Sequence, residues 1–244
     1  MTRPFKMGRA PRREHTPQRA QAPQPSRESA EPGTTYQGSF IVFEGGDGVG
    51  KTTQVDLLES WLRDRGETVV RTREPGGTPL GTQLRELLLH GEHVDPRAEA
   101  LLYAADRAQH VADVVKPALV AGKVVLQDRY IDSSVAYQGA GRVLGAAEIA
   151  QLSEWATGSL EPDLTVLLDL DPGVAAARRH RGRDSEDRLE REARAFHEAV
   201  RDGFLARAER APERYLVLDA SADPQTLHQD IAKRAAALLS QSST

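Results

Sequence analysis

The segment Gly45–Thr52 combines glycines with a lysine and a hydroxyl group at fixed spacing. Its residues are Gly-Gly-Asp-Gly-Val-Gly-Lys-Thr, which match the pattern G-x-x-x-x-G-K-[ST] at every fixed position. Glycines let backbone N–H groups converge on phosphate oxygens, and the N-terminus of a following helix adds partial positive charge. Lys51 would reach the β- and γ-phosphates, and the Thr52 hydroxyl would take one site on Mg²⁺. We therefore predict a nucleoside triphosphate site formed by Gly45, Gly46, Asp47, Gly48, Val49, Gly50, Lys51, Thr52 and Thr53.

A glycine-rich turn could match this pattern by chance. The apolar run Phe40–Phe43 precedes the motif, as a buried strand should, and helical spacing follows from Lys51 to about Arg65. This strand–loop–helix context favours phosphate binding over a chance match, and it leaves the reaction open.

Two further groups of polar residues follow predicted strands. Asp128 follows the run Val124–Leu126, where an acid can orient Mg²⁺ or its waters, and the adjacent Arg129 can hold an anionic acceptor. A surface ion pair would explain these two residues equally well. The loop Arg73–Thr78 contains a proline and two glycines and precedes a helix that carries Arg85. An ordinary turn with scattered arginines is the alternative there.

Apolar runs alternate with helical spacing from Ser39 onward. Predicted strands cover Phe40–Phe43, Thr68–Val70, Val124–Leu126, Leu164–Leu170 and Tyr215–Leu218. Predicted helices cover 51–65, 80–90, 97–115 with an end at Pro117, 145–157, a segment beginning at Asp171-Pro172, and a last segment from Asp223-Pro224 to about Leu239. This alternation predicts an α/β three-layer sandwich with a parallel central sheet. Ligands of such sheets bind beyond the carboxyl ends of the strands, where each motif falls.

Residues 1–38 differ from the rest of the chain. They are rich in Pro, Arg, Gln and Ser, so we expect a disordered Arg/Pro-rich extension ahead of one domain at 39–244. A weak nucleic-acid-binding or partner-binding arm is the functional alternative to a dispensable extension. The extension carries seven Lys or Arg against three Glu, a net charge of +4; because the whole chain carries −4, the domain carries −8. An acidic domain argues against nucleic acid as the main partner.

Other classes of protein are also disfavoured by the composition. The chain has no cysteine, which excludes disulfides and cysteine nucleophiles. No apolar run approaches the roughly 18 residues that a membrane span needs, and the N-terminus lacks the apolar stretch of a secretory signal. We therefore expect a soluble cytoplasmic protein without a membrane partner.

Four segments together resemble bacterial thymidylate kinases. FEGGDGVGKTT, TREPGGTPLG, DRYIDSSVAYQGAG and PDLTVLLDL follow one another in this order, and the resemblance extends from about Phe40 to Leu239. It implies the fold of P-loop nucleoside monophosphate kinases and the phosphorylation of dTMP to dTDP by Mg²⁺ and ATP, in dTTP biosynthesis. It also implies a homodimer.

The resemblance implies roles on the acceptor side. Tyr103 matches a residue that stacks on thymine, although Phe is commoner there, and Arg107 matches one that donates to the carbonyl edge of the base. The i, i+4 spacing places both on one helical face. Without the family, Tyr103 would more often be a core residue. Arg85 and Arg129 match positions that bind the acceptor phosphate.

Further acceptor contacts follow from the second and third segments. Ser134 and Gln138 match positions beside the base, and Tyr137 matches a residue that crowds the 2′ position of the sugar. Glu74 completes the substrate-binding set that the resemblance implies.

The charged stretch at 178–188 resembles the lid of the family, although a solvated helix end is the alternative. Family members carry the catalytic arginine either in the phosphate loop or in the lid. Position 48 is Gly here, so the resemblance favours the lid type, with Arg183 and Arg178 as candidates among five arginines. Asp47 matches an acid near the 3′-hydroxyl of the acceptor and the metal. The implied catalytic residues are Lys51, Arg183, Arg178, Asp47 and Arg129, and the implied metal ligands are Thr52 and Asp128.

Two rival functions remain at this point. A different nucleoside kinase or nucleoside monophosphate kinase would share the phosphate loop and need different base contacts. A non-enzymatic P-loop protein is the second class: a GTPase would carry Asn-Lys-x-Asp, which the sequence lacks, and a motor ATPase would need a partner or nucleic-acid surface.

Overall fold

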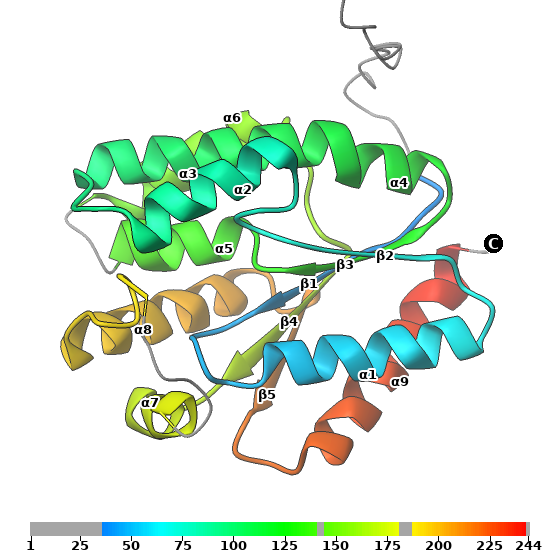
Figure 1. Ribbon diagram of the computed structural model, residues 1–244. Coiled ribbons are helices and arrows are strands. Elements are labelled where there is room, and N and C mark those ends of the chain that lie inside the picture. The colour runs from blue at the N-terminus through cyan, green and yellow to red at the C-terminus, as the bar shows by residue number, and fades with distance from the viewer. Residues whose placement is uncertain (1–35, 141–143, 181–186, 243–244) are drawn as a thin grey trace, which may run out of the picture. The chain divides into compact units, whose positions relative to one another are not determined.

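The computed structural model describes residues 36–140, 144–180 and 187–242 (Figure 1). Five parallel strands form one sheet in the order β2-β3-β1-β4-β5. Their bounds are β1 (Phe40–Glu44), β2 (Val69–Arg73), β3 (Val124–Asp128), β4 (Leu164–Asp169) and β5 (Tyr215–Asp219). The structure confirms the predicted parallel sheet and places each strand on or next to its predicted run.

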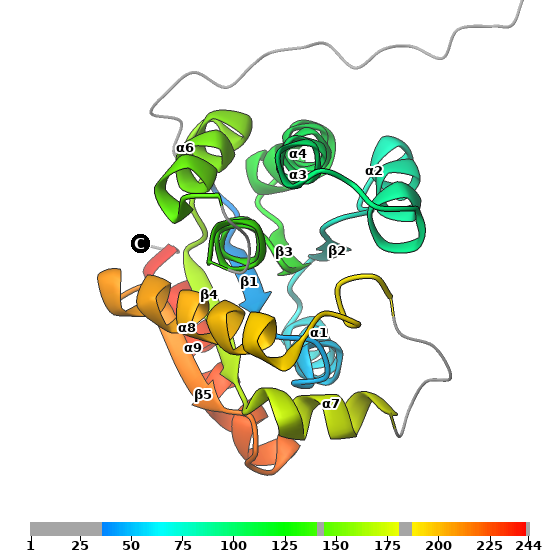
Figure 2. The ribbon, with the colours of Figure 1, turned by 90° about the vertical axis from the view of Figure 1, so that its left-hand side faces the viewer.

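Helices cover both faces of this sheet, which confirms the three-layer arrangement. In Figure 1 and Figure 2, α1 and α9 lie on one side of the strands and α3 and α4 on the other. The helices are α1 (Lys51–Asp64), α2 (Pro79–Arg85), α3 (Pro96–His110), α4 (Lys116–Val120), α5 (Ile131–Ser134), α6 (Ala146–Thr157), α7 (Pro172–His180), α8 (Arg194–Arg210) and α9 (Pro224–Ser242).

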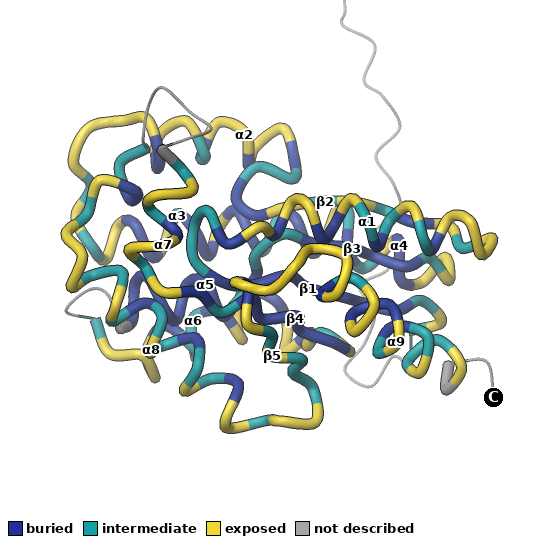
Figure 3. The backbone as a smooth tube through the Cα atoms, turned by 90° about the horizontal axis from the view of Figure 1, so that it is seen from below, coloured by how far each residue is buried: buried dark blue, intermediate teal, exposed yellow. Residues whose placement is uncertain are grey.

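The core follows the two-residue period of the strands. In β1, Ile41 and Phe43 pack into the cluster that holds Leu58 of α1, whereas Phe40 and Val42 pack into the opposite cluster with Leu119 of α4. Both faces of β1 are therefore buried, as its dark blue tube in Figure 3 illustrates. A strand buried on both faces is continuously apolar, which is why its sequence shows no alternation.

The helix predicted to end at Pro117 in fact continues. Three π-helical segments extend helices, namely η1 (Glu86–His90), η2 (Val111–Val115) and η3 (Val135–Ala140), and α4 follows η2 directly. Pro117 lies in the first turn of α4. A missing N–H is tolerated there, and the wider turns of η2 just before it change the hydrogen-bond register.

Several predicted boundaries are confirmed by capping contacts. Asp171 Oδ1 accepts a hydrogen bond of 2.8 Å from Gly173 N at the start of α7, and Asp223 Oδ2 accepts one of 3.0 Å from Gln225 N at the start of α9. Contacts of the N-terminal part begin slightly ahead of Ser39, because Gly38 N donates to Leu119 O at 2.9 Å. Most of the predicted extension lies outside the described residues. No helix in the described ranges is both long and apolar enough to span a bilayer.

The strand register brings the functional segments to one edge. Phe43 of β1 and Arg73 of β2 are both register partners of Asp128 on β3. The loops that follow these three strands therefore leave the sheet side by side.

Candidate active site

The phosphate loop joins β1 to α1 in a conformation that requires glycine. Gly45 has φ +128°, and a Cβ there would lie 2.4 Å from Leu168 O on the neighbouring strand β4. Gly50 has φ +99° and precedes the first residue of α1. Any larger residue at Gly45 would collide with backbone, so the loop stays close to the sheet and the N-terminus of α1 opens toward it.

Lys51 is turned toward its own loop. Its Nζ donates to Gly46 O at 2.7 Å and to Gly45 O at 3.1 Å, and its side chain is buried. Burial, followed by the nearby Arg129, lowers the pKa of Lys51 below its ordinary value. A buried ammonium group with only carbonyl partners is suited to receive a phosphate anion.

Arg129 and Asp47 form an ion pair beside this lysine. Arg129 donates to Asp47, to Ser133 Oγ at 3.0 Å and to Gly45 O at 3.1 Å. The Tyr137 hydroxyl donates to Asp47 Oδ2 at 2.8 Å. Burial alone would raise the pKa of Asp47, but Arg129 and then Lys51 hold that pKa well below its ordinary value. Asp47 is therefore an ionised carboxylate that fixes the guanidinium of Arg129.

Two cavities meet at this ion pair. We call the first the Tyr103 cavity; it has a volume of about 530 Å³. It is lined by all eight predicted acceptor residues, Glu74, Arg85, Tyr103, Arg107, Arg129, Ser134, Tyr137 and Gln138, and also by Asp47. We call the second the Lys51 cavity; it has a volume of about 1120 Å³ and is lined by Lys51, Thr52, Asp128, Arg73, Arg178 and Arg179 among others. Asp47, Glu74, Arg85 and Arg129 line both cavities.

The structure places most members of the predicted phosphate loop at the walls of cavities. Gly48, Gly50 and Thr52 line the Lys51 cavity together with Asp47 and Lys51. Thr53 is exposed one residue further along α1. The remaining members, Gly45, Gly46 and Val49, line an adjoining cavity that also contains Asp47.

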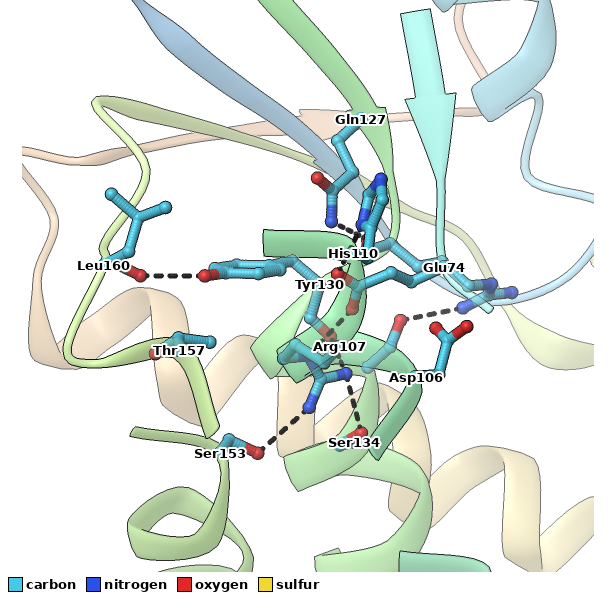
Figure 4. A network of polar contacts seen from close by, with 12 residues as sticks. Glu74, Asp106, Arg107, His110, Gln127, Tyr130, Ser134, Ser153, Thr157 and Leu160 are labelled. Atoms are coloured by element: carbon cyan, nitrogen blue, oxygen red, sulfur yellow. Dashed lines mark hydrogen bonds and ion pairs between the residues drawn. The ribbon is translucent and has the colours of Figure 1, made fainter. Parts of the chain in front are cut away.

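A buried network behind the Tyr103 cavity holds Arg107 (Figure 4). Its Nε donates to Glu74 Oε2 at 2.8 Å, and its Nη2 donates to Ser134 Oγ at 2.9 Å. Tyr130 O and Ser153 Oγ accept two more hydrogen bonds, at 3.0 and 3.1 Å. The guanidinium therefore contacts the β2 end, α5 and α6 at once.

Other predicted acceptor residues are also fixed by partners. Gln138 Nε2 donates to Glu99 Oε1 at 2.8 Å, and Glu99 is itself paired with Arg188. Arg85 Nη1 donates to Pro75 O at 3.0 Å, next to the cis peptide bond between Glu74 and Pro75. These hydrogen bonds hold the side chains in place, so the Tyr103 cavity keeps a defined shape.

The metal prediction can be tested against the donor atoms present. Asp128 Oδ1 is buried and has no hydrogen-bond partner in the described part of the chain, and Asp128 lines the same cavity as Thr52. In that same part, no three His, Asp or Glu side chains converge into a metal site of their own. Mg²⁺ commonly takes only one or two protein ligands together with phosphates and waters. The residues therefore fit a magnesium ion that is bound jointly with a nucleotide.

The lid candidates fall in different places. Arg178 Nη1 donates to Ala220 O at 2.9 Å, beyond the end of β5, and its side chain lines the Lys51 cavity. Arg183 lies outside the described residues. Arg179, which the sequence did not single out, donates to Asp47 O of the phosphate loop at 2.9 Å.

Arg73 was named in a predicted loop and given no role of its own. It lines the Lys51 cavity at the end of β2, and its place after a predicted strand, like that of Asp128, is the signal that could have identified it. For Arg179, the surrounding run of similar charged residues offered no such signal.

Known proteins match this chain over most of its length. The sequence profile of thymidylate kinases matches residues 43–231. The thymidylate kinase of Clavibacter michiganensis subsp. michiganensis is 60% identical over 203 residues, covering 83% of this chain and 96% of the relative. That of Leifsonia xyli subsp. xyli is 59% identical over 202 residues, covering 82% and 96%. The crystal structure of thymidylate kinase from Ehrlichia chaffeensis matches with a TM-score of 0.67 at 35% identity, covering 81% of this chain and 97% of that one. The chain therefore belongs to the thymidylate kinase family.

Proposed function

We propose that this protein transfers the γ-phosphoryl group of ATP to dTMP and releases dTDP and ADP. The thymidylate kinases to which this chain is similar are named for that activity. The match covers 96% of the length of each of them. The observation that carries the proposal is the meeting of two cavities at Arg129 and Asp47, because a direct transfer requires two anions at van der Waals distance.

The donor nucleotide would occupy the Lys51 cavity. Its phosphates would accept hydrogen bonds from the backbone N–H groups of the loop and from Lys51, next to the N-terminus of α1. Thr52 and Asp128 would hold Mg²⁺, which when bound supplies neutralisation of the β- and γ-phosphate oxygens. Asp128 supports this role because its buried Oδ1 has no partner within the described ranges.

The acceptor would occupy the Tyr103 cavity. Tyr103 offers a ring face to the base, and Arg107 can direct a remaining N–H toward a base carbonyl. Gln138 and Ser134 lie beside the base in this arrangement, and Tyr137 crowds the sugar. Arg129 and Arg85 lie where the two cavities overlap and would bind the acceptor phosphate.

The transfer itself needs no general base. A phosphate monoester is largely dianionic near neutral pH, so one of its oxygens can attack directly. The bond between the γ-phosphorus and the bridging oxygen of ATP breaks as the bond to the acceptor oxygen forms. Lys51 and a lid arginine would stabilise the charge on the transferred group, and Arg129 would hold the acceptor in line. Arg183 and Arg178 remain the candidates from the sequence, and Arg179 joins them through its contact with Asp47 O.

A panel of nucleoside monophosphates tests the proposal. Purified protein is mixed with ATP and dTMP, dCMP, dGMP or AMP, and ADP release is followed with magnesium or with excess EDTA. We expect stoichiometric dTDP from dTMP, a far lower rate with the other acceptors, and loss of activity with EDTA. Folded protein that leaves dTMP unconverted in the presence of ATP and magnesium would refute the assignment.

We also propose a homodimer in the cytoplasm, where nucleotide substrates are available. Leu101 on α3 and Trp155 on α6 are large apolar side chains with exposed fractions of 58% and 81%, and the two helices pack against each other. Exposed apolar side chains of this size are common at interfaces between subunits. Sedimentation equilibrium of the wild type and of Leu101→Glu measures this, and a monomeric wild type would contradict it.

A further inference from the structure

A chain of side chains leads from Thr72, which is partly buried, through the buried His110 and Glu74 to Arg107. Figure 4 shows its part from His110 to Arg107. Thr72 Oγ1 lies 2.6 Å from His110 Nε2, and His110 Nδ1 lies 2.8 Å from Glu74 Oε1. The second oxygen of that carboxylate accepts the 2.8 Å hydrogen bond from Arg107 Nε. We call this the Thr72–Arg107 chain. It connects β2 with the last two turns of α3.

The carboxylate of Glu74 is fixed on both oxygens. Glu74 and His110 have exposed fractions of 3% and 0%, so neither can exchange its partner for bulk water. A carboxylate held at one oxygen only could rotate about its terminal bond, because that rotation is soft. The contact with His110 Nδ1 therefore determines where Oε2 meets the guanidinium of Arg107.

The imidazole ring itself has little room to move. A Cβ at Gly77 would lie 2.5 Å from both Cδ2 and Nε2 of His110, so the loop backbone packs directly on the ring. Asp106 approaches the same loop from α3, where its Oδ1 accepts a hydrogen bond of 3.2 Å from Gly76 N. The carboxylate of Glu74 contacts this histidine directly, and the carboxylate of Asp106 interacts with it electrostatically. The loop, the ring and the carboxylate thus form one rigid support.

Arg107 depends on that support for the direction of its free donor. A guanidinium has five N–H groups, and four hydrogen bonds to protein oxygens account for four of them in the described residues. The fifth N–H group belongs to Nη1 of Arg107, and Arg107 lines the Tyr103 cavity. A planar group directs this donor wherever the other four contacts place it.

We propose that His110 is a positioning residue for acceptor recognition, acting through Glu74 on Arg107. This inference rests on the proposed role of Arg107 at the base. Thymine presents a carbonyl oxygen at C4, which accepts from Arg107, whereas cytosine presents an amino group there, which cannot. The orientation of Arg107 then contributes to the discrimination between dTMP and dCMP, and His110 contributes to it without touching either nucleotide.

Two substitutions of similar size separate positioning from packing. In His110→Asn the amide nitrogen can take the place of Nδ1 and keep the donor to Glu74. In His110→Gln the amide lies nearer the place of Nε2, so the contact with Thr72 is kept and the donor to Glu74 is lost. We expect His110→Gln to raise the KM for dTMP about tenfold, which corresponds to about 1.4 kcal/mol. The ratio of kcat/KM between dTMP and dCMP should fall by a similar factor, with the KM for ATP unchanged. His110→Asn should restore most of both quantities.

The outcomes distinguish this inference from failure of the proposed function. A wild type that does not phosphorylate dTMP defeats the proposed function before any variant is compared. An active wild type with equal effects of the two substitutions on KM and on the dTMP/dCMP ratio overturns the role of His110, and so does a parallel rise in the KM for ATP. If His110→Gln does not fold, His110→Leu, which has a similar size and no donor, is compared with His110→Asn. A rise in the KM for dTMP is then expected only in His110→Leu, and equal values would overturn the inference.

Discussion

Replacing Asp106 by asparagine should change how the stability of this protein depends on pH. The Asp106 side chain is fully buried behind the Tyr103 cavity, and its Oδ2 has no hydrogen-bond partner in the described part of the chain. Burial, followed by the carboxylate of Glu74, raises the pKa of Asp106 to about 6. The folded protein thus retains a proton that the unfolded chain loses near the ordinary value of 3.8.

The sign and size of the effect follow from linkage. Between the two pKa values the folded state binds more protons than the unfolded state, so this group's contribution to the free energy of unfolding falls as pH rises. The full interval corresponds to roughly 3 kcal/mol, of which about 2 kcal/mol is lost between pH 4.5 and 8. Asparagine keeps an oxygen for Gly76 N and has no charge to bury. The free energy of unfolding of Asp106→Asn, relative to wild type, should therefore rise by about 2 kcal/mol between pH 4.5 and 8.

Thermal unfolding followed by circular dichroism at pH 4.5, 6, 7 and 8 measures this difference. For a domain of this size about 2 kcal/mol corresponds to a relative shift in Tm of roughly 4–8 °C. Asp113→Asn is the matched control, because it removes the same charge from an exposed position one turn beyond α3. A Tm difference between Asp106→Asn and wild type that is constant with pH, or equal to that of Asp113→Asn, would refute the reasoning.

Four other substitutions test the site and the core. Lys51→Ala should lower kcat by orders of magnitude with little change in Tm, because it removes a cation from the transferred phosphoryl group; an unchanged rate in steady-state kinetics would reject the role of Lys51. Arg129→Lys should raise the KM for dTMP at least about tenfold, since an ammonium group cannot reproduce the forked contacts with Asp47 and Ser133; an unchanged KM would place the acceptor phosphate elsewhere. Arg183→Ala should lower kcat more than acceptor affinity, and the opposite pattern would limit Arg183 to binding. Leu58→Ala should cost about 2–5 kcal/mol in chemical denaturation, because Leu58 is fully buried between α1 and the sheet; a smaller loss would mean that the cavity collapses.

Local signals explain which parts of the fold could be predicted. Each strand contains a short apolar run, and the phosphate loop is a continuous motif, so neither requires knowledge of distant contacts. The π-helical segment η2 has no comparable signature, and Pro117 therefore suggested a helix end that does not exist. Such segments depend on tertiary packing rather than on local propensity.

Residues of the candidate site differed in how far the sequence could identify them. The acceptor residues came from resemblance, because Tyr103 by itself has the pattern of a core residue. His110 and Glu99 gave no signal, since their partners lie far away in the chain: Glu74 is 36 residues from His110, and Gln138 is 39 residues from Glu99. Positioning residues of this kind are defined by contacts that only the folded chain creates.

The backbone at Arg129 shows why two adjacent residues can line the same cavity. Successive side chains of a strand point to opposite faces, yet Asp128 and Arg129 both line the Lys51 cavity. Arg129 has φ +68°, a left-handed conformation that costs a residue with a Cβ about 1–2 kcal/mol. Hydrogen bonds hold it there, from Arg129 N to Phe43 O at 2.9 Å and from Gln127 Nε2 to Arg129 O at 3.0 Å. Glycine would remove the strain and with it the guanidinium that Asp47 fixes where the cavities meet. An unfavourable backbone kept in place by neighbouring contacts, with a charged side chain as its only gain, is the pattern expected of a residue retained for function.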